Sequence, residues 1–350
     1  MKIDFPIDID IFDSEAQVAE SLANLLDSAS GDHLIISGPT KSSAYADRVL
    51  GGYNAKPLHR MVLHTNSVSE VSSVERALRH NTPAIIVAIG GGKVGDFAKR
   101  LAYMNNIPLL LIPTIIANDG LISPIAVLQD EGKSVSLPGR MPDTVLIDIQ
   151  MIGTSPNVYL RSAASDLITN ISATNDWERA MSGDIARVHH LALQMSRMAA
   201  HMVLHCSDWD SDSPVFLKTI IYGQMLSGIA MALAGSSRPC SGSEHLIAHA
   251  LDSQSLGMDT LHGEKVGITS RFCLHLQQMM DPKIEAFFQE FGVSRIFPGC
   301  ERYTEAQIAE LFSLSRKMRP GRETVLDNYS DTDLAGRYLD YVSSSEGGTP

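Results

Sequence analysis

Short apolar runs alternate with amphipathic segments along the first part of the chain. The apolar runs end at turns with glycine or proline and are typical of strands buried on both faces of a parallel sheet. We expect strands at 33–37, 60–64, 83–89, 108–112, 125–128 and 145–147, and helices at 13–26, 42–50, 69–79 and 94–103. This alternation predicts a Rossmann-like α/β domain whose ligand site lies at the carboxyl ends of the strands.

The pattern changes near Pro156, after which long helical periodicities dominate. The predicted helices are 158–177, 185–206, 214–234, 242–250, 265–279, 283–291 and 305–317. We therefore predict an α/β domain over 1–152 and an all-α domain over 153–330. Residues 331–350 end in small and polar residues and are expected to form a frayed tail.

Composition and charge narrow the classes of function. The 350 residues are 44% hydrophobic and 19% charged, which is typical of a globular protein. A net charge of −12 without a Lys/Arg cluster disfavours nucleic acid and anionic membranes as partners. No apolar run is expected to reach the length of a membrane span. The four cysteines lack C-x-x-C spacing and no signal peptide is evident, so we expect free thiols in a reducing cytosol.

Histidines gather between residues 235 and 267. His245 and His249 are four residues apart and therefore share one face of a helix, and His262 follows inside Leu-His-Gly-Glu. Two imidazoles with one further ligand make a typical catalytic metal site. The zincin pattern is absent, because Glu244 precedes the first histidine. The alternative is a buried helix whose histidines are satisfied by hydrogen bonds.

One carboxylate stands out on the predicted helix 158–177. Asp166 lies among apolar and small residues, in the segment RSAASDLITNISA. Burying it requires a salt bridge or a metal ion. Because the histidines lack an oxygen ligand to complete a metal site, we choose Asp166 for that role.

Two loops lie at the ends of predicted strands. Gly90-Gly91-Gly92-Lys93 joins a strand to a helix, where backbone N–H groups can hold a pyrophosphate, although the G-x-G-x-x-G spacing is absent. The alternative is a tight turn. In the second loop, Asn118 and Asp119 are polar groups at a strand end, and the alternative is a turn or a helix cap.

The chain resembles the sn-glycerol-1-phosphate dehydrogenases, which belong to a superfamily of metal-dependent polyol dehydrogenases. That superfamily also contains glycerol dehydrogenase, iron-containing alcohol dehydrogenases and dehydroquinate synthase. The matching segments are GPT at 38–40, IGGGKVGDFAK at 89–99, IPLLLIPT at 107–114, NDGLISP at 118–124, SDLITNISATNDWE at 165–178, GIAMALAGSSRPCSGSEHLIAHALD at 228–252, LHGEKVG at 261–267 and MRPGRETVL at 318–326. Two positions depart from the family's usual residues: Ala163-Ala164-Ser165 replaces Gly-Cys-Gly, and Asn118 replaces histidine.

The resemblance implies a dehydroquinate synthase-like architecture, with an NAD(P)-binding domain at 1–152 and a metal- and substrate-binding domain at 153–330. It implies Zn²⁺ held by Asp166, His245 and His262, with Ni²⁺ or Fe²⁺ as alternatives, and NAD(P)H as the cofactor. Cofactor contacts are expected from Gly38, Pro39, Thr40, Gly90, Gly91, Gly92, Lys93, Asp96, Thr114 and Ser123. The implied reaction, in phospholipid metabolism, reduces dihydroxyacetone phosphate to sn-glycerol 1-phosphate. The resemblance also favours a homo-oligomer. From the cysteines and the charge we expect a cytoplasmic protein with no nucleic-acid partner and no membrane span.

Reducing a phosphorylated ketone also requires a proton donor and cations for the phosphate. We assign Asp119 and His249 as catalytic residues, with Asp119 also contacting the substrate. Arg238 and Arg319 are assigned to the phosphate, with Arg322 as an alternative and structural salt bridges as the other interpretation. Three other functions remain open: a biosynthetic dehydrogenase for another phosphorylated ketone, a sugar phosphate cyclase, and a binding protein without activity.

Overall fold

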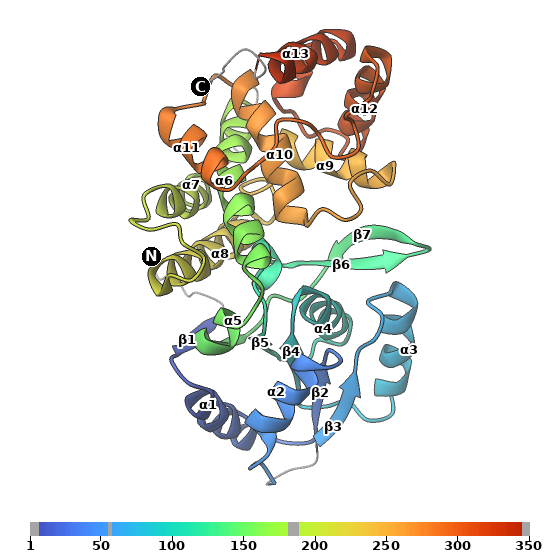
Figure 1. Ribbon diagram of the computed structural model, residues 1–350. Coiled ribbons are helices and arrows are strands. Elements are labelled where there is room, and N and C mark those ends of the chain that lie inside the picture. The colour runs from blue at the N-terminus through green and yellow to red at the C-terminus, as the bar shows by residue number, and fades with distance from the viewer. Residues whose placement is uncertain (1–6, 55–57, 181–188, 345–350) are drawn as a thin grey trace. The chain divides into compact units, whose positions relative to one another are not determined.

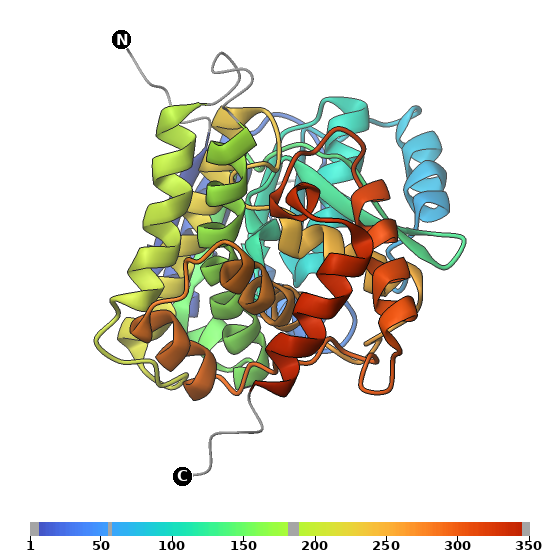
Figure 2. The ribbon, with the colours of Figure 1, turned by 90° about the horizontal axis from the view of Figure 1, so that it is seen from above.

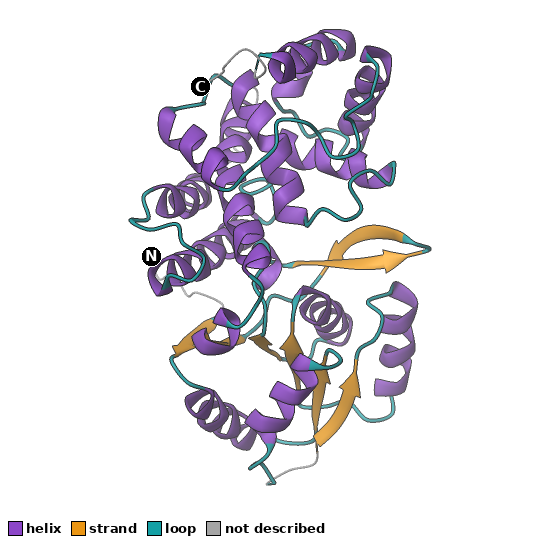
Figure 3. Ribbon diagram, in the orientation of Figure 1, coloured by secondary structure: helices purple, strands orange, loops and turns teal. Residues whose placement is uncertain are grey.

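A computed structural model describes residues 7–54, 58–180 and 189–344 of the chain (Figure 1). The chain divides into two compact units, Met1–Ile116 with Gly120–Pro156, and Ala117–Asp119 with Asn157–Pro350. Figure 3 shows that the strands belong to the first unit and that the second unit is built of helices. The expected fold class, an α/β unit with a parallel sheet plus an all-α unit, is confirmed.

Six parallel strands form the sheet of the first unit, in the order β1-β8-β5-β4-β2-β3. They are β1 (Asp8–Phe12), β2 (His33–Ser37), β3 (Leu58–Val62), β4 (Ile85–Gly90), β5 (Leu109–Pro113) and β8 (Thr144–Asp148). Every residue of β2 and of β5 is buried, as the apolar runs predicted. A separate antiparallel hairpin joins β6 (Ile125–Asp130) to β7 (Lys133–Pro138).

Strands β1 and β7 were not predicted. Strand β1 lies at an edge of the sheet, and its sequence DIDIF alternates carboxylates with apolar residues instead of forming an apolar run. Most residues of β7 are exposed, so its polar sequence KSVSLP carries no core signal. Half-buried strands of this kind depend on their hydrogen-bonded neighbours more than on hydrophobicity.

Helices cover the sheet in the first unit. They are α1 (Glu15–Ser28), α2 (Lys41–Leu50), α3 (Val68–Leu78), α4 (Gly92–Asn105) and α5 (Ile149–Gly153), with the short 3₁₀ helix η1 (Asp119–Leu121) after β5. The apolar face of α1 places Val18, Leu22 and Leu26 in one core cluster with Ile35 and Val87 of the sheet. This core holds the strand ends and the loops that follow them in place.

Helices make up the second unit. They are α6 (Asn157–Ala180), α7 (His190–Leu204), α8 (Pro214–Ala234), α9 (Ser243–Ser253), α10 (His262–Leu276), α11 (Pro282–Glu290), α12 (Glu305–Lys317), η3 (Val325–Asn328) and α13 (Asp331–Ser343). Helix α6 packs against α7 and α10, and the long helices α6 and α7 lie side by side in Figure 2. The predicted start of a helix at residue 185 lies outside the described residues.

The expected tail from residue 331 is wrong for residues 331–343, which form α13. The side chain of Ser330 caps the helix by accepting a hydrogen bond from the backbone N–H of Asp333, in a capping box. Leu334, Tyr338 and Tyr341 share one buried face of this helix, and the Tyr338 ring stacks on Phe297 at 4.2 Å between ring centroids. Polar residues between these positions hid the helical periodicity.

Helix α8 corrects the expectation that no segment reaches the length of a membrane span. By length and composition it is the one such helix among the described residues, with a mean hydropathy of 1.4 over a window that is 56% buried. Core helices of soluble proteins meet the same criteria, and α8 packs against α7 and α6. We therefore interpret α8 as a core helix of the second unit.

Candidate metal and cofactor sites

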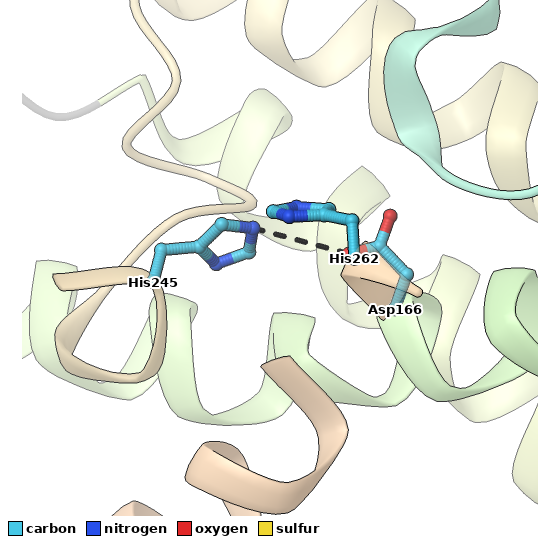
Figure 4. A group of neighbouring side chains, drawn as sticks. All are labelled: Asp166, His245 and His262. Carbon is cyan, nitrogen blue, oxygen red and sulfur yellow. Dashed lines mark ion pairs between the residues drawn. The ribbon is translucent and has the colours of Figure 1, made fainter. Parts of the chain in front are cut away.

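Asp166, His245 and His262 come together in the second unit although they lie on three different helices, α6, α9 and α10. One potential ligand atom from each lies within 4.8 Å of the other two. Figure 4 shows the three side chains directed toward one another, with a dashed line between His245 Nε2 and Asp166 Oδ1, which lie 3.9 Å apart. Helix α10 begins at His262, three residues before the predicted start, so this histidine lies in the first turn of the helix.

The Asp166 carboxylate is 2% exposed and only half satisfied. Its Oδ2 accepts a hydrogen bond of 2.8 Å from the backbone N–H of Asp119, whereas Oδ1 has no hydrogen-bond partner among the described residues. Burial raises the pKa of Asp166 well above its usual range, and the carboxylates of Asp119 and Glu244 raise it further. A cation bound at Oδ1 would offset the free-energy cost of burying the ionised carboxylate.

Glu244 determines the orientation of the His245 ring and which of its two nitrogens carries the hydrogen. His245 Nδ1 lies 3.0 Å from Glu244 Oε1, which also accepts a hydrogen bond from the backbone N–H of Gly242. The second oxygen, Oε2, accepts a hydrogen bond from the Ser172 hydroxyl at 2.8 Å. With its Nδ1 hydrogen donated to Glu244, His245 directs an unprotonated Nε2 toward Asp166. No sequence pattern assigns Glu244 this role, because the contact with His245 depends on the fold.

Burial lowers the pKa of His245, His249 and His262 to about 3 in each case. All three rings are therefore neutral at neutral pH, the form that ligates metal ions. His249 joins the other two, with its ring centroid 6.3 Å from that of His245 and 6.5 Å from that of His262. It is not a member of the three-residue group that the structure brings within ligand distance.

Small residues let α6 and α10 approach each other at this site. A Cβ added at Gly263, next to His262, would lie 2.0 Å from the carbonyl oxygen of Ser162. A Cβ at Gly267 would lie 3.0 Å from the Ser165 side chain. The substituted segment Ala163-Ala164-Ser165 therefore still provides the small residues that the close helix packing needs.

The loops predicted to bind the cofactor lie at the carboxyl ends of three neighbouring strands. Gly38-Pro39-Thr40 follows β2, Gly90–Lys93 joins β4 to α4, and Thr114 follows β5. Two hydrogen bonds connect the loop after β5 to its neighbours: the backbone N–H of Thr114 donates to Gly90 O at 3.1 Å, and the Thr114 hydroxyl lies 3.2 Å from that of Ser42, in the first turn of α2. Parallel α/β sheets bind ligands at this edge.

The glycines of the 90–92 loop differ in what surrounds them. A Cβ at Gly90 would lie 2.7 Å from the Val94 side chain, so packing within the protein requires this glycine. A Cβ at Gly91 would meet only Ile115 at 3.8 Å, and one at Gly92 would meet nothing within 4 Å. Open space beside Gly91 and Gly92, at the N-terminus of α4, leaves the backbone N–H groups accessible to an anion.

Lys99 is a buried residue that the sequence analysis missed. Its side chain is 1% exposed and its Nζ contacts Asp96 Oδ1 at 2.8 Å, the carbonyl oxygen of Gly120 at 2.7 Å and the Ser123 hydroxyl at 3.4 Å. Asp96 and Ser123, both expected to contact the cofactor, are therefore joined through this lysine. Its position among the apolar residues of α4 was the available signal.

The fold and this site define a class of protein. Residues 14–156 match the family described as iron-containing alcohol dehydrogenase. The structure is similar to that of a probable glycerol dehydrogenase from Sinorhizobium meliloti, with a TM-score of 0.77 and 20% identity over 97% of this chain and 98% of the other. It is also similar to a sulfoacetaldehyde reductase from Bifidobacterium kashiwanohense in complex with NAD⁺, with a TM-score of 0.72 and 18% identity over 98% and 100% of the two chains. The fold is that of glycerol dehydrogenases and iron-containing alcohol dehydrogenases.

Relatives with higher sequence identity narrow this class. A glycerol-1-phosphate dehydrogenase (NAD(P)⁺) of Nitrosopumilus maritimus is 31% identical over 308 residues, covering 87% of this chain and 86% of the relative. One from Pyrococcus furiosus is 32% identical over 301 residues, covering 84% and 85%. The chain belongs to the glycerol-1-phosphate dehydrogenase family of oxidoreductases, as the sequence motifs predicted.

Proposed function

We propose that this protein is a metal-dependent NAD(P)H oxidoreductase that reduces dihydroxyacetone phosphate to sn-glycerol 1-phosphate. Relatives that share about a third of its residues over most of its length carry the name glycerol-1-phosphate dehydrogenase. The observation that carries the proposal is the unpartnered Oδ1 of buried Asp166, 3.9 Å from His245 Nε2. A buried carboxylate oxygen facing neutral imidazole nitrogens is a donor set for a divalent cation.

We assign Asp166, His245 and His262 as the metal ligands and Zn²⁺ as the metal. One carboxylate and two imidazoles leave a coordination position open for substrate, as in catalytic zinc sites. The same donors also accept Ni²⁺ or Fe²⁺, so metal analysis of the purified protein decides between them.

When bound, the divalent cation supplies a Lewis acid for the ketone oxygen and NAD(P)H supplies the hydride. The protein orients the ligands and delivers the proton. We assign proton donation to Asp119, with His249 as the second candidate. The backbone N–H of Asp119 donates a hydrogen bond of 2.8 Å to the Asp166 carboxylate. Burial lowers the pKa of His249 to about 3, so its ring is neutral at neutral pH. It can therefore pass a proton on during the reaction but does not carry one in the resting enzyme.

We assign the cofactor to the loops at the ends of β2, β4 and β5. The backbone N–H groups of 38–40 and 90–92 would bind the pyrophosphate, with Lys93 and Thr114 beside them. Asp96 and Ser123 contribute through Lys99. No acidic residue occurs at His64–Asn66, after β3, which favours tolerance of both NADH and NADPH.

Incubating the metal-loaded protein with dihydroxyacetone phosphate and NADH or NADPH tests the proposal. We expect one cofactor oxidised per substrate reduced, and a product that sn-glycerol-3-phosphate dehydrogenase does not accept. Phosphate release with unchanged cofactor would instead identify a sugar phosphate cyclase, and oxidation only with another phosphorylated ketone would identify a different dehydrogenase. We also propose that the protein is a cytoplasmic homo-oligomer. Light scattering on the purified protein tests the oligomeric state.

A further inference from the structure

Residues 114–125, which we call the crossing segment, belong partly to each unit. Ala117–Asp119 group with the second unit, whereas the residues on either side of them group with the first. The backbone N–H of Asp119 donates to Asp166 Oδ2 at 2.8 Å, and the Ser162 hydroxyl donates to the carbonyl oxygen of Ala117 at 3.0 Å. The crossing segment therefore brings Asp119, the assigned proton donor, to the assigned metal ligand Asp166.

Lys99 of α4 holds the part of the crossing segment that belongs to the first unit. Its Nζ donates to the carbonyl oxygens of Gly120 at 2.7 Å and of Ile125 at 2.5 Å, and it lies 3.4 Å from the Ser123 hydroxyl. Asp96 Oδ1 lies 2.8 Å from the same nitrogen. An ammonium group has three donor hydrogens and no acceptor, so these oxygens satisfy it completely. The Lys99 ammonium is therefore used for contacts within the protein.

Stability alone gives no reason for a lysine at this position. The Lys99 side chain is 1% exposed, and every other buried residue of α4 is apolar or glycine. Burial raises the pKa of Asp96, against the lowering effect of the Lys99 charge, so the pair carries a desolvation cost. Replacing a buried ion pair by apolar residues is often neutral or stabilising. The lysine is better explained by the groups that it holds in place.

The backbone of Asp119 is held on both sides. Gly120 follows Asp119 directly, and both belong to the 3₁₀ helix η1. Lys99 fixes the carbonyl oxygen of Gly120, and Asp166 fixes the backbone N–H of Asp119. Because the two hydrogen bonds start from different helices, α4 and α6, they define where the Asp119 side chain begins. A reacting group needs such a defined position.

We propose that Lys99 is a positioning residue, which holds Asp119 in place for proton transfer and for its hydrogen bond to Asp166. Lys99 acts through the Gly120 carbonyl, and Asp96 supplies the opposite charge that a buried ammonium needs. The inference rests on the proposed function and deepens it, because it names a residue on which proton transfer at the same site depends.

The first test compares the double variant Lys99→Met/Asp96→Asn with Tyr45→Phe in the metal-loaded enzyme. The double variant removes both charges, so no unpaired carboxylate stays buried. Tyr45→Phe also removes a buried contact with a carboxylate of the first unit, the 2.8 Å hydrogen bond from Tyr45 to Asp148, which lies outside the crossing segment. We expect the double variant to lower kcat about tenfold to hundredfold, the usual cost of a small misplacement of a reacting group. Tyr45→Phe should keep the kcat of the parent and lower only the melting temperature.

Two measurements distinguish positioning from general stability. The solvent deuterium isotope effect on kcat should increase in the double variant, because a misplaced donor slows proton transfer, and it should not change in Tyr45→Phe. The KM for NAD(P)H should change less than about threefold in both variants. An unchanged kcat and isotope effect in the folded double variant would overturn the inference. A raised KM for NAD(P)H with an unchanged kcat would also overturn it, because Lys99 would then serve the cofactor loops.

Lys99→Gln tests the same inference with a smaller change. Glutamine keeps two N–H donors on a shorter, neutral side chain, so its kcat should lie between those of the parent and the double variant. If the double variant does not fold, Lys99→Gln decides the question. A kcat and isotope effect equal to those of the parent would then overturn the inference.

Metal affinity separates this inference from the proposed function. The Co²⁺ affinity of the double variant, measured by chelator competition, should fall about threefold to tenfold, because the N–H of Asp119 holds Asp166 less firmly. Tyr45→Phe should bind Co²⁺ as the parent does. If affinity falls in this way but the parent does not reduce dihydroxyacetone phosphate, Lys99 positions Asp119 and the proposed reaction is wrong. If the parent reduces dihydroxyacetone phosphate but the double variant keeps the kcat and Co²⁺ affinity of the parent, the reaction stands and the inference is wrong.

Discussion

At the scale of single residues, the candidate metal site depends on which polar atoms have partners. Asp166 has one satisfied oxygen and one unpartnered oxygen, and His245 has one ring nitrogen directed at Glu244 and the other at Asp166. His249 lies in the same cluster but outside the ligand group. Substitutions at these positions should therefore separate metal binding from proton transfer.

Asp166→Asn should lower metal affinity at least about tenfold, because the neutral amide cannot offset the charge of a cation. His249→Ala should keep the metal, because this ring lies outside the ligand group, and should keep turnover if Asp119 transfers the proton; loss of turnover would assign proton transfer to His249, the second candidate. Chelator competition on the purified variants gives the affinities, and elemental analysis gives the occupancies. If Asp166→Asn binds metal as tightly as the parent, Asp166 is not the oxygen ligand, and Asp119 or Glu264 becomes the candidate.

Glu244→Gln should lower metal affinity about tenfold to hundredfold, as is usual when a hydrogen-bond partner of a ligating histidine is changed. The glutamine keeps the shape but removes the charge that holds the Nδ1 hydrogen of His245. The d–d spectrum of the Co²⁺-substituted variant should also change, because the ring is held less firmly.

Asp176→Asn is the matched control for Glu244→Gln. Asp176 is equally buried at 0% exposure, but it accepts hydrogen bonds from the backbone N–H groups of Ser243 and Val325 and from Gln277, and it contacts no histidine among the residues that the structure describes. Its substitution should lower the melting temperature and leave metal affinity within about threefold of the parent. Equal losses of affinity in both variants would show that Glu244 acts only through general stability.

At the scale of elements, the junction of β4 with α4 combines a packing requirement with an accessible helix terminus. Gly90 is needed because Val94 lies against it, whereas Gly91 has open space and an extended backbone that any residue can adopt. Adjacent glycines in one loop are therefore present for different reasons, and only one of those reasons concerns a ligand.

Gly91→Val should raise the KM for NAD(P)H strongly, by about tenfold or more, with little loss of stability, because its side chain would obstruct the N–H groups at the start of α4. Gly90→Ala should instead lower the melting temperature through its contact with Val94. Steady-state kinetics and thermal melts of both variants check this. An unchanged KM in folded Gly91→Val would mean that the loop is only a turn.

At the scale of the whole molecule, buried histidines make stability depend on pH and on the metal. His245, His249 and His262 have folded-state pKa values of about 3, below the unfolded value near 6.5. Below pH 6.5 the unfolded state therefore binds protons that the folded state does not, and the free energy of unfolding falls as the pH falls toward 3. The raised pKa values of Asp166 and Asp176 act in the opposite direction.

The melting temperature of the metal-free protein should therefore fall between pH 6.5 and pH 4.5, measured in a chelator by thermal melts. His249→Gln removes one of the three histidines and should make this fall shallower by about a third. Metal should raise the melting temperature most at neutral pH, where the ligands are deprotonated, and less as the pH decreases. Identical pH slopes for the parent and His249→Gln would show that these histidines do not control acid stability.

Local sequence determined the parallel sheet, the glycine loop and the shared face of His245 and His249. The runs at 33–37, 83–89 and 108–112 predicted β2, β4 and β5 because a strand covered on both faces needs apolar residues throughout. The helical spacing of His245 and His249 was visible because it depends only on the 3.6-residue turn. The same local rules missed β1 and α13, whose apolar positions are interrupted by polar ones.

The composition of the sites was decided by packing between segments far apart in the chain. Only the close approach of α6 to α10, at Ser162 and Gly263, shows why Asp166 lies beside His262. Only the folded second unit shows that Glu244 holds the Nδ1 side of His245. Sequence periodicity specifies which face of an element is buried, whereas the partners of a buried charge depend on the elements packed against it.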